Sequence, residues 1–403
     1  MKRLLKSISY IFFVGVFLPP LSVSANDDFN AWKKEFEKEA LSAGIKQSTL
    51  SKYLPQMELL PRVIEQDIKL PEFLQNFWDY TRVRLTEEKI QKGQEMMKKY
   101  HTWLKRVQDK YGIEPQYLVA LWGMETNYGG YLGKTKLLNS LGSLAYHPRR
   151  RSYFTKELIA YFKILESEPY PPEWGSWDGG FGNFQFMPTT FMAYAVDADG
   201  NGTKSLIGSI PDSFASAANF LKAMGWKEGQ TWGREVSLPD DFNWERMHGL
   251  KQSVSEWQKE GIKAYGLSSF PENELEIEAR LLSPLGADGP FFLAYPNFEY
   301  LRRWNGLELY GLTTGLLADI LAGNRGAQTY PSDFEPIRTE TIIEMQEILA
   351  RNGYNIGNPD GKLGPKTRSA LRDFQKKNHL KQDGYPNKDT LIKLNTYRKE
   401  LNK

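Results

Sequence analysis

Apolar residues recur at every third or fourth position over much of this 403-residue chain, which is the repeat of an amphipathic α-helix. Phe29, Trp32 and Phe36 show this repeat, with charged residues between them. The pattern predicts a mainly α protein, with helical sequence through most of 28–108. Individual helices are expected over about 86–111, 115–128, 153–166, 189–194, 214–224 and 307–322.

Three stretches break the helical pattern. Residues 169–182 contain four Gly and three Pro, which predicts a loop, and loops on a rigid scaffold often carry binding groups. Residues 231–290 are less regular and could include strands near 234–238, 253–257 and 274–282. Turn residues and weak periodicity after residue 323 predict a linker over 324–338.

The first 25 residues have the three-part pattern of a secretory signal peptide. Lys2, Arg3 and Lys6 give a basic start, 8–18 is mostly apolar, and Val23-Ser24-Ala25 is a small-residue cleavage site. The apolar part is too short to span a bilayer. A retained N-terminal anchor is the alternative. The chain has no cysteine, so neither a disulfide nor a lipid-attached cysteine is expected.

Charge and composition narrow the classes of function. The formal net charge of +3 at pH 7 comes wholly from Lys2, Arg3 and Lys6, so the rest of the chain is near neutral. This argues against a nucleic-acid-binding protein. The 11 Trp and 21 Tyr suit contacts with sugar rings, but they suit a hydrophobic core equally well.

Glu125 is the strongest catalytic candidate. Its helix is expected to begin at Pro115 and to stop at Gly129-Gly130. Residues three, four and seven positions earlier are apolar: Trp122, Leu121 and Leu118. A carboxyl group against such side chains should have a raised pKa, and a carboxylic acid that is protonated near neutral pH can protonate a glycosidic oxygen. The alternative is a buried glutamate that forms an ion pair with an arginine.

A second candidate site is a metal loop. Oxygen-bearing side chains occupy positions 1, 3, 5 and 7 of an EF-hand-like loop: Asp197, Asp199, Asn201 and Thr203. Position 12 is Gly208 instead of the usual glutamate, and Asp212 could supply the missing carboxylate if the loop is longer. The alternative is a turn that binds no metal.

Several motifs together resemble one known family. Glu125–Gly129, Pro148–Arg150, Gln185–Thr189 and Asp197–Gly202 occur in the order found in lytic murein transglycosylases of type B, glycoside hydrolase family 103. The resemblance runs from about 28 to 323 and implies a lysozyme-like, mainly α catalytic domain over 26–323 with a deep groove for glycan strands. It also implies non-hydrolytic cleavage of the β-1,4 bond between MurNAc and GlcNAc in peptidoglycan, leaving a 1,6-anhydroMurNAc end.

The resemblance assigns roles to individual residues. Glu125 matches the single catalytic acid/base, and no second carboxylate in a comparable apolar setting is found near it in the sequence. The family's substrate-binding positions match Ser176, Gln185, Asn305, Tyr310, Arg149 and Arg150. Its calcium loop matches Asp197, Asp199, Asn201, Thr203 and Asp212. Trp304 and Asn183-Phe184 depart from the residues usual at their positions.

Residues 339–403 form a separate small unit. Asp360-Gly361 is followed by Thr367, and Asp383-Gly384 is followed by Thr390 as a second, weaker copy. The turns predict three helices, and the unit resembles the peptidoglycan-binding domain often fused to cell-wall hydrolases. A solvated helical tail is the alternative. A wall-binding unit would raise the effective concentration of the catalytic groove at its substrate.

These features favour a periplasmic lytic transglycosylase of a Gram-negative bacterium that acts on peptidoglycan glycan strands and does not bind nucleic acid. No cofactor is required for this chemistry, and a structural calcium ion is the one cofactor implied. Three alternatives remain open: a hydrolytic muramidase, a non-catalytic peptidoglycan-binding scaffold and a calcium-binding adhesion protein. Outer-membrane association through a protein partner also remains open.

Overall fold

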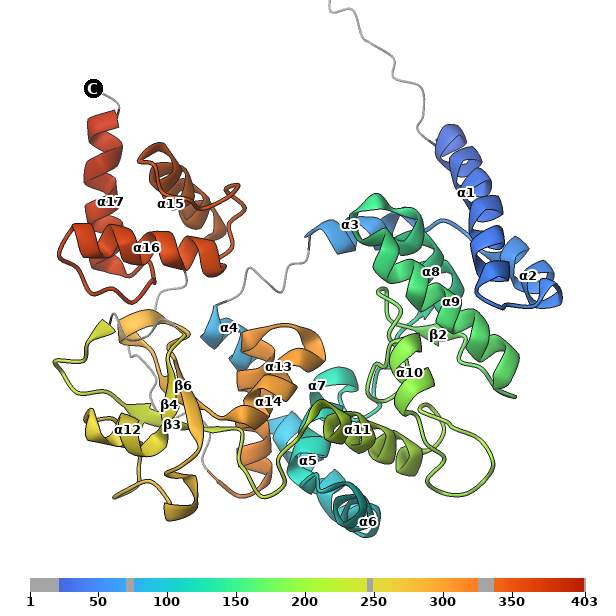
Figure 1. Cartoon of the computed structure of the whole chain (residues 1–403), viewed down its shortest axis with the longest axis horizontal. Helices are drawn as coiled ribbons and strands as arrows, with labels where there is room; N and C mark the ends of the chain where they lie inside the picture. The colour runs from blue at the N-terminus through green and yellow to red at the C-terminus, as the bar shows by residue number, and fades with distance from the viewer. Residues whose placement is uncertain (1–21, 70–75, 245–248, 325–336, 402–403) are drawn as a thin grey trace, which may run out of the picture.

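The structure is a computed structural model, and it describes residues 22–69, 76–244, 249–324 and 337–401 (Figure 1). Most of the expected signal peptide and of the expected linker therefore lies outside the described residues. Within the described part, no helix has the length and apolar character needed to cross a membrane. The first helix begins at Ser22 and so includes the last residues of the expected leader.

One group of helices is formed from the N-terminal segment and a later helical pair. The group contains α1 (Ser22–Ser42), α2 (Gln47–Tyr53), α3 (Pro61–Lys69), α8 (Leu137–Tyr146) and α9 (Arg151–Ser167). The apolar repeat predicted in α1 faces inward, because Phe36 is buried and its ring lies 5.8 Å from that of Phe162 on α9. Helix α8 packs against both α3 and α9.

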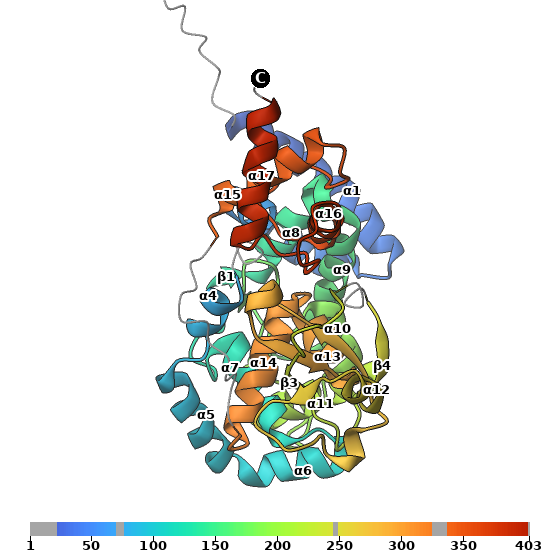
Figure 2. The ribbon, with the colours of Figure 1, turned by 90° about the vertical axis from the view of Figure 1, so that its left-hand side faces the viewer.

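The central helices surround α7 (Pro115–Thr126), in which Leu118 to Leu121 are fully buried. The surrounding helices are α4 (Phe77–Arg82), α5 (Glu87–Lys99), α6 (His101–Tyr111), α10 (Pro188–Tyr194), α11 (Ile210–Met224), α13 (Pro296–Asn305) and α14 (Glu308–Leu321). Helix α14 packs along α7 and α13. Figure 2 shows α5 and α6 at the end of the molecule opposite α17 (Lys388–Leu401).

An antiparallel five-stranded sheet forms a second, smaller core. Its order is β4-β6-β7-β3-β5, and Trp257 of α12 (Val254–Lys259) is fully buried in this core. The strands are β3 (Gly233–Ser237), β4 (Lys251–Ser253), β5 (Lys263–Ala264), β6 (Glu278–Leu282) and β7 (Phe291–Ala294). A separate two-stranded ribbon pairs β1 (Thr135–Lys136) with β2 (Trp174–Gly175).

The C-terminal module contains α15 (Thr339–Arg351), α16 (Pro365–Lys377) and α17, as the sequence predicts. Its two Asp-Gly turns are held in the same way by fully buried glutamines. Gln346 Nε2 donates to Thr367 Oγ1 at 3.0 Å while its Oε1 accepts from Gly361 N at 2.8 Å. Gln375 makes the equivalent contacts with Thr390 at 3.0 Å and Gly384 at 2.9 Å. The module is thus an internal repeat.

Some expectations about secondary structure are wrong in detail. The helix predicted over 86–111 is divided into α5 and α6 at Tyr100, whose φ of −104° and ψ of 16° interrupt the helix. Residues 254–257, read as part of a strand, begin α12, because Ser253 and Glu256 form a capping box at its N-terminus.

Candidate active site

Glu125 lies in the last turn of α7. The helix begins at Pro115 as predicted, but it ends at Thr126, with Asn127 as its C-cap, and not at Gly129-Gly130. Asn127 and Tyr128 both have left-handed backbone conformations, with φ of 50° and 59°. Such conformations are uncommon for residues other than glycine and are often found at functional sites. The early turn leaves the half-buried Glu125 side chain at the end of a helix that is buried from Tyr117 to Gly123.

The turn after Glu125 is fixed by the ring of Tyr128. This ring is buried and packs edge-on against Trp122 at 5.7 Å. A Cβ atom at Gly123 would lie 2.7 Å from the Tyr128 ring, and one at Gly93 on α5 would lie 2.4 Å from its hydroxyl oxygen. Both glycines are therefore needed to make room for the ring.

Two lysines from α5 contact the C-terminal end of α7. Lys89 Nζ donates to Gly123 O at 3.1 Å, and Lys92 Nζ donates to Asn127 O at 3.0 Å. Ammonium groups at this end of a helix interact favourably with the helix dipole. Burial, with the charges of Arg84 and Lys92, lowers the pKa of Lys89.

Tyr310 contacts Glu125 directly. It lies in the first turn of α14, is almost fully buried, and its hydroxyl group donates a hydrogen bond to Glu125 Oε1. Burial and the neighbouring carboxyl group of Glu125 raise the pKa of Tyr310 well above its usual value. The phenol therefore stays protonated at physiological pH and remains a hydrogen-bond donor to the carboxylate.

Ser176 lies in the glycine-rich loop, and Gln185 lies just after it. Ser176 Oγ donates to Asp178 Oδ1 and lies 3.0 Å from Gly180 O. Gln185 follows in a short hairpin, has φ of 49°, and donates from Nε2 to Gly182 O at 2.9 Å. The predicted loop character is confirmed, and the side chain of Gln185 is only half buried.

Asn183 is a positioning residue, although in the sequence it is visible only as a departure from the family pattern. Its side-chain oxygen accepts from Trp122 Nε1 at 2.8 Å, and its backbone oxygen accepts from Thr126 Oγ1 at 2.9 Å. Its Nδ2 donates to Leu206 O at 2.9 Å. Asn183 thus joins the Glu125 helix to the Gln185 hairpin. The only signal in the sequence was an asparagine in the aromatic stretch Phe181-Gly182-Asn183-Phe184, which does not by itself indicate this role.

Asn305 is the exposed last residue of α13. Its neighbour Trp304 packs against three aromatic rings of the hairpin and α11. The ring centroids are 6.2, 5.8 and 5.3 Å from those of Phe184, Phe186 and Phe220, respectively. The hairpin therefore contacts α7 through Asn183 and α13 through Trp304. These contacts connect the segments that carry Glu125, Gln185 and Asn305.

Arg149 and Arg150 both pair with one buried carboxylate, although their own side chains are partly exposed. Arg149 Nη1 lies 3.1 Å from Asp67 Oδ2, and Arg150 contacts the other oxygen of the same carboxylate. Asp67 is almost fully buried on α3. A substrate carboxylate in the predicted groove would have to compete with Asp67 for these guanidinium groups.

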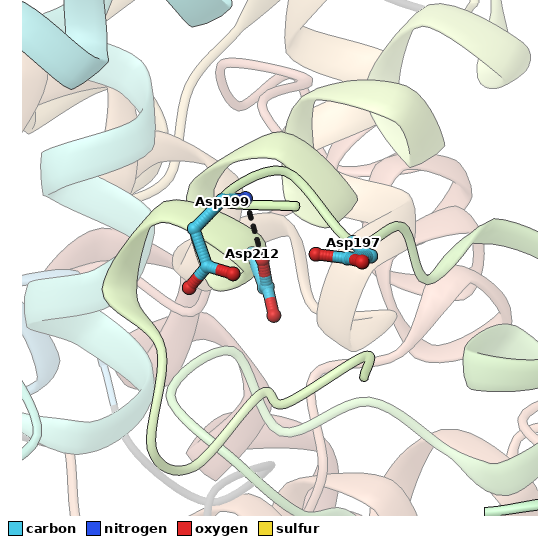
Figure 3. Close-up of side chains that lie close together, drawn as sticks. All are labelled: Asp197, Asp199 and Asp212. Atoms are coloured by element: carbon cyan, nitrogen blue, oxygen red, sulfur yellow. Dashed lines mark hydrogen bonds between the residues drawn. The ribbon is translucent and has the colours of Figure 1, made fainter. Parts of the chain in front are cut away.

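The predicted metal loop is folded around acidic side chains. One carboxylate oxygen from each of Asp197, Asp199 and Asp212 lies within 4.8 Å of the others (Figure 3). Asp212, fully buried at the start of α11, accepts from Ala198 N at 2.8 Å and Ser205 N at 3.0 Å. The chain therefore brings Asp212 to the loop, as the sequence analysis proposed for a lengthened EF-hand-like loop.

The side chains of this loop carry the oxygen atoms that a calcium ion prefers as ligands. Asn201 Oδ1 accepts from Thr203 N and Oγ1 at 2.9 and 2.6 Å, so both residues lie in the same turn. Three close carboxylates repel one another, and a divalent cation with a preference for oxygen ligands relieves this repulsion. Asp197, Asp199 and Asp212 would supply the charge, with further oxygens from the turn at Asn201 and Thr203.

Comparisons with known proteins agree with this geometry. The transglycosylase SLT domain matches residues 28–319, and a peptidoglycan binding domain matches residues 338–394. Membrane-bound lytic murein transglycosylase B of Escherichia coli (strain K12) is 30% identical over 252 residues, which are 60% of this chain and 66% of that protein.

Solved structures share the fold. SltB3 from Pseudomonas aeruginosa, in complex with NAG-anhNAM-pentapeptide, is 36% identical, with a TM-score of 0.85 over 91% of this chain and 99% of that one. The Escherichia coli lytic transglycosylase Slt35 in complex with calcium is 27% identical, with a TM-score of 0.61 over 72% of this chain and 92% of that one. The predicted mainly α, lysozyme-like fold is confirmed, and the chain belongs to the transglycosylase SLT domain family.

Proposed function

We propose that this protein is a peptidoglycan lytic transglycosylase that cleaves the MurNAc-β-1,4-GlcNAc bond and leaves a 1,6-anhydroMurNAc end. The observation that carries the proposal is Glu125 at the end of α7, hydrogen-bonded to the protonated Tyr310 in a chain of the transglycosylase family. The 36% identity to SltB3, whose structure holds NAG-anhNAM-pentapeptide, supports the nature of the product.

The proposed reaction uses one protein carboxyl group. Glu125 donates its proton to the glycosidic oxygen as the bond to C1 breaks, and the 2-acetamido group stabilises the positive charge at C1. The Glu125 carboxylate then accepts the proton of the muramic 6-hydroxyl group. At the same time the oxygen of that hydroxyl group bonds to C1. The proton returns to Glu125 and no water is consumed. Because the substrate supplies the nucleophile, the second carboxylate of an ordinary glycosidase is not needed.

Tyr310 has a defined role in the proposed reaction. Its hydroxyl group donates to the carboxylate that forms after the first proton transfer. A donor already in place when charge develops lowers the barrier without further reorganisation. We assign Ser176, Gln185 and Asn305 to substrate contacts in the groove. Arg149 and Arg150 remain candidates that first have to leave Asp67.

A calcium ion in the loop formed by Asp197, Asp199, Asn201, Thr203 and Asp212 would have a structural task. The proposal is supported by the acidic cluster and by the calcium complex of Slt35. Asp212 belongs to α11, and Leu206 in the intervening loop accepts from Asn183 Nδ2. A bound cation would thus stabilise a loop that contacts the Gln185 hairpin, without taking part in the proton transfers.

The site of action proposed is the periplasm. The N-terminal pattern of a signal peptide supports export, and the relative in Escherichia coli is named a membrane-bound enzyme. The peptidoglycan binding domain matched at 338–394 supports binding to the cell wall.

Product analysis tests the proposed function. Purified murein digested with the wild-type protein should release muropeptides that are lighter by one water than the products of hydrolysis, as measured by mass spectrometry. Glu125→Gln should release none. Products with a reducing end would show a hydrolytic muramidase. Binding to murein without any release would show a scaffold.

A further inference from the structure

A cleft separates the C-terminal module from the catalytic domain. Its volume is about 780 Å³, which is large enough for a short peptide. On the catalytic side it is lined by β6 and by the junction of α13 and α14, and on the other side by α16 and the turn at Asp383. Figure 1 shows the module beside the sheet at this place.

The module is attached through its second repeat. Asp383 Oδ2 accepts from Ala287 N at 2.8 Å, and Arg368 Nη2 donates to Pro284 O at 3.3 Å. Tyr385 is buried in the main core of the catalytic domain and lies against Gly286, where a Cβ atom would be 2.4 Å from the Tyr385 Cβ. These contacts orient α16 toward the cleft.

The two repeats differ at the positions that face their turns. Thr339 and Ile343 lie beside Gly361 in the first repeat. Arg368 and Arg372 lie beside Gly384 at the corresponding positions of the second repeat. The correspondence follows from the chain spacing, which is the same as that between Gln346 and Gln375. Threonine and isoleucine are compatible with the repeat, so the fold itself does not require two arginines. They occur in the copy whose Asp-Gly turn is hydrogen-bonded to the catalytic domain.

Arg368 and Arg372 form no ion pair with any carboxylate in the described part of the chain, unlike the arginines on the opposite wall of the cleft. Across the cleft, Arg280 and Arg302 both form ion pairs with Glu299, and Arg280 also pairs with Glu308. Arg368 donates to two backbone carbonyls, those of Leu363 and Pro284. Arg372 forms no ion pair with any residue in the described part of the chain.

The carboxylate of Asp383, in the turn beside Arg372, already accepts hydrogen bonds from four neutral donors. Asp383 accepts from Gln375 Nε2 at 2.7 Å, Tyr385 N at 2.9 Å and Asn387 Nδ2 at 3.1 Å, in addition to Ala287 N at 2.8 Å. Burial and the Arg368 charge lower the pKa of Arg372, only partly offset by Asp373 and Asp383. A ligand carboxylate in the cleft would relieve this unfavourable placement.

We propose that Arg368 and Arg372 form a second substrate site that binds a carboxylate of the peptidoglycan stem peptide. The inference rests on the proposed function, which supplies a peptide-bearing glycan as the ligand. A guanidinium group suits a carboxylate because it can donate two parallel hydrogen bonds. Contact at this site while another part of the strand occupies the groove would strengthen binding without changing the chemistry at Glu125.

The test measures binding of full-length protein in the Glu125→Gln background, so that cleavage does not interfere. Arg372→Gln should weaken binding of soluble peptide-bearing glycan strands roughly tenfold. Binding of strands whose peptides have been removed by an amidase should not change. Arg351→Gln removes the same charge from an exposed site on α15 and should bind both strands as the parent does. Arg372→Lys should recover part of the affinity.

Two results would overturn the proposal. Equal affinity of Arg372→Gln and its parent for peptide-bearing strands would show that the cleft does not bind the stem. Equal weakening on peptide-free strands would show that the arginine recognises the glycan or its lactyl carboxylate instead. Thermal unfolding of Arg372→Gln identifies any loss of fold. Failure of the proposed catalytic function would leave the binding difference intact, because these measurements need no turnover.

Discussion

Asp212 and Glu125 are both carboxylate residues on helices of the catalytic domain, but their hydrogen-bond partners differ. Asp212 accepts from backbone N–H groups of its loop, which can only donate. Glu125 contacts the hydroxyl group of Tyr310, which can donate or accept. Backbone donors fix an acceptor in place, whereas a side-chain hydroxyl allows the carboxyl group to lose and regain a proton. The first arrangement suits structure and the second suits acid/base catalysis.

The largest effect is expected for Glu125→Gln, which removes the exchangeable proton. Turnover of murein should fall by about 10³-fold or more, since general acid/base groups contribute about 10²- to 10⁴-fold and this one acts twice. Glu157→Gln is the control, because Glu157 is a buried glutamate that accepts from Thr189 N and Oγ1. Equal activity of both variants in a murein release assay would remove Glu125 from the mechanism.

The next largest effect should be on stability. Asp212→Ala leaves the N–H groups of Ala198 and Ser205 without their acceptor and removes one carboxylate from the loop. The free energy of unfolding should fall by about 3 kcal/mol, as measured by urea denaturation. Calcium should raise the melting temperature of the wild type and not of the variant. Asp109→Ala, at an exposed site, should change neither the free energy of unfolding nor the rise in melting temperature with calcium. Unchanged stability of Asp212→Ala would mean that the loop does not support the domain.

Tyr310→Phe tests the hydroxyl group at the catalytic carboxylate. Loss of a hydrogen bond to a charged group costs about 1.5–3 kcal/mol, so kcat should fall about 10- to 100-fold. Tyr295→Phe removes a similar buried hydroxyl, which donates to Glu274 at 2.9 Å. That control should keep kcat and lose only stability. If both variants kept the wild-type kcat, Tyr310 would be a packing residue.

The smallest effect concerns a third carboxylate, Asp319, which accepts from Trp232 Nε1 at 3.0 Å. Burial raises the pKa of Asp319 from 3.8 to about 7. Between these values the folded protein holds a proton that the unfolded chain has lost, so stability falls as the pH rises through this window. Between pH 6 and 8 the loss should be about 1.4 kcal/mol. Asp319→Asn should remove this part of the pH dependence of urea denaturation, and an unchanged slope would contradict the assignment.

The sequence predicted features that depend on local pattern. The helix of Glu125, the glycine-rich loop, and the repeated Asp-Gly…Thr turns all follow from spacing and turn residues, and the structure confirms them. The carboxylate at Asp212 could be placed near the metal loop because the missing ligand had few candidates within the following residues.

Features that depend on distant contacts could not be predicted. Nothing in the spacing of Asn183 shows that it will accept from Trp122 and fix α7. The pairing of Arg149 and Arg150 with Asp67 joins segments more than 80 residues apart. The break at Tyr100 replaces one long helix by two, although the apolar repeat continues across it. Tertiary packing decides such features, and a local pattern carries no record of it.

Tyr385 of the C-terminal module is buried in the core of the catalytic domain, so the two parts share one apolar core. A truncation at residue 338 removes this ring from Gly286 and exposes apolar surface that the module normally covers. The shortened protein should then be prone to self-association, and the intact chain should unfold with both parts in one cooperative transition. We therefore expect the boundary between domains in the sequence not to be a boundary between independent folding units.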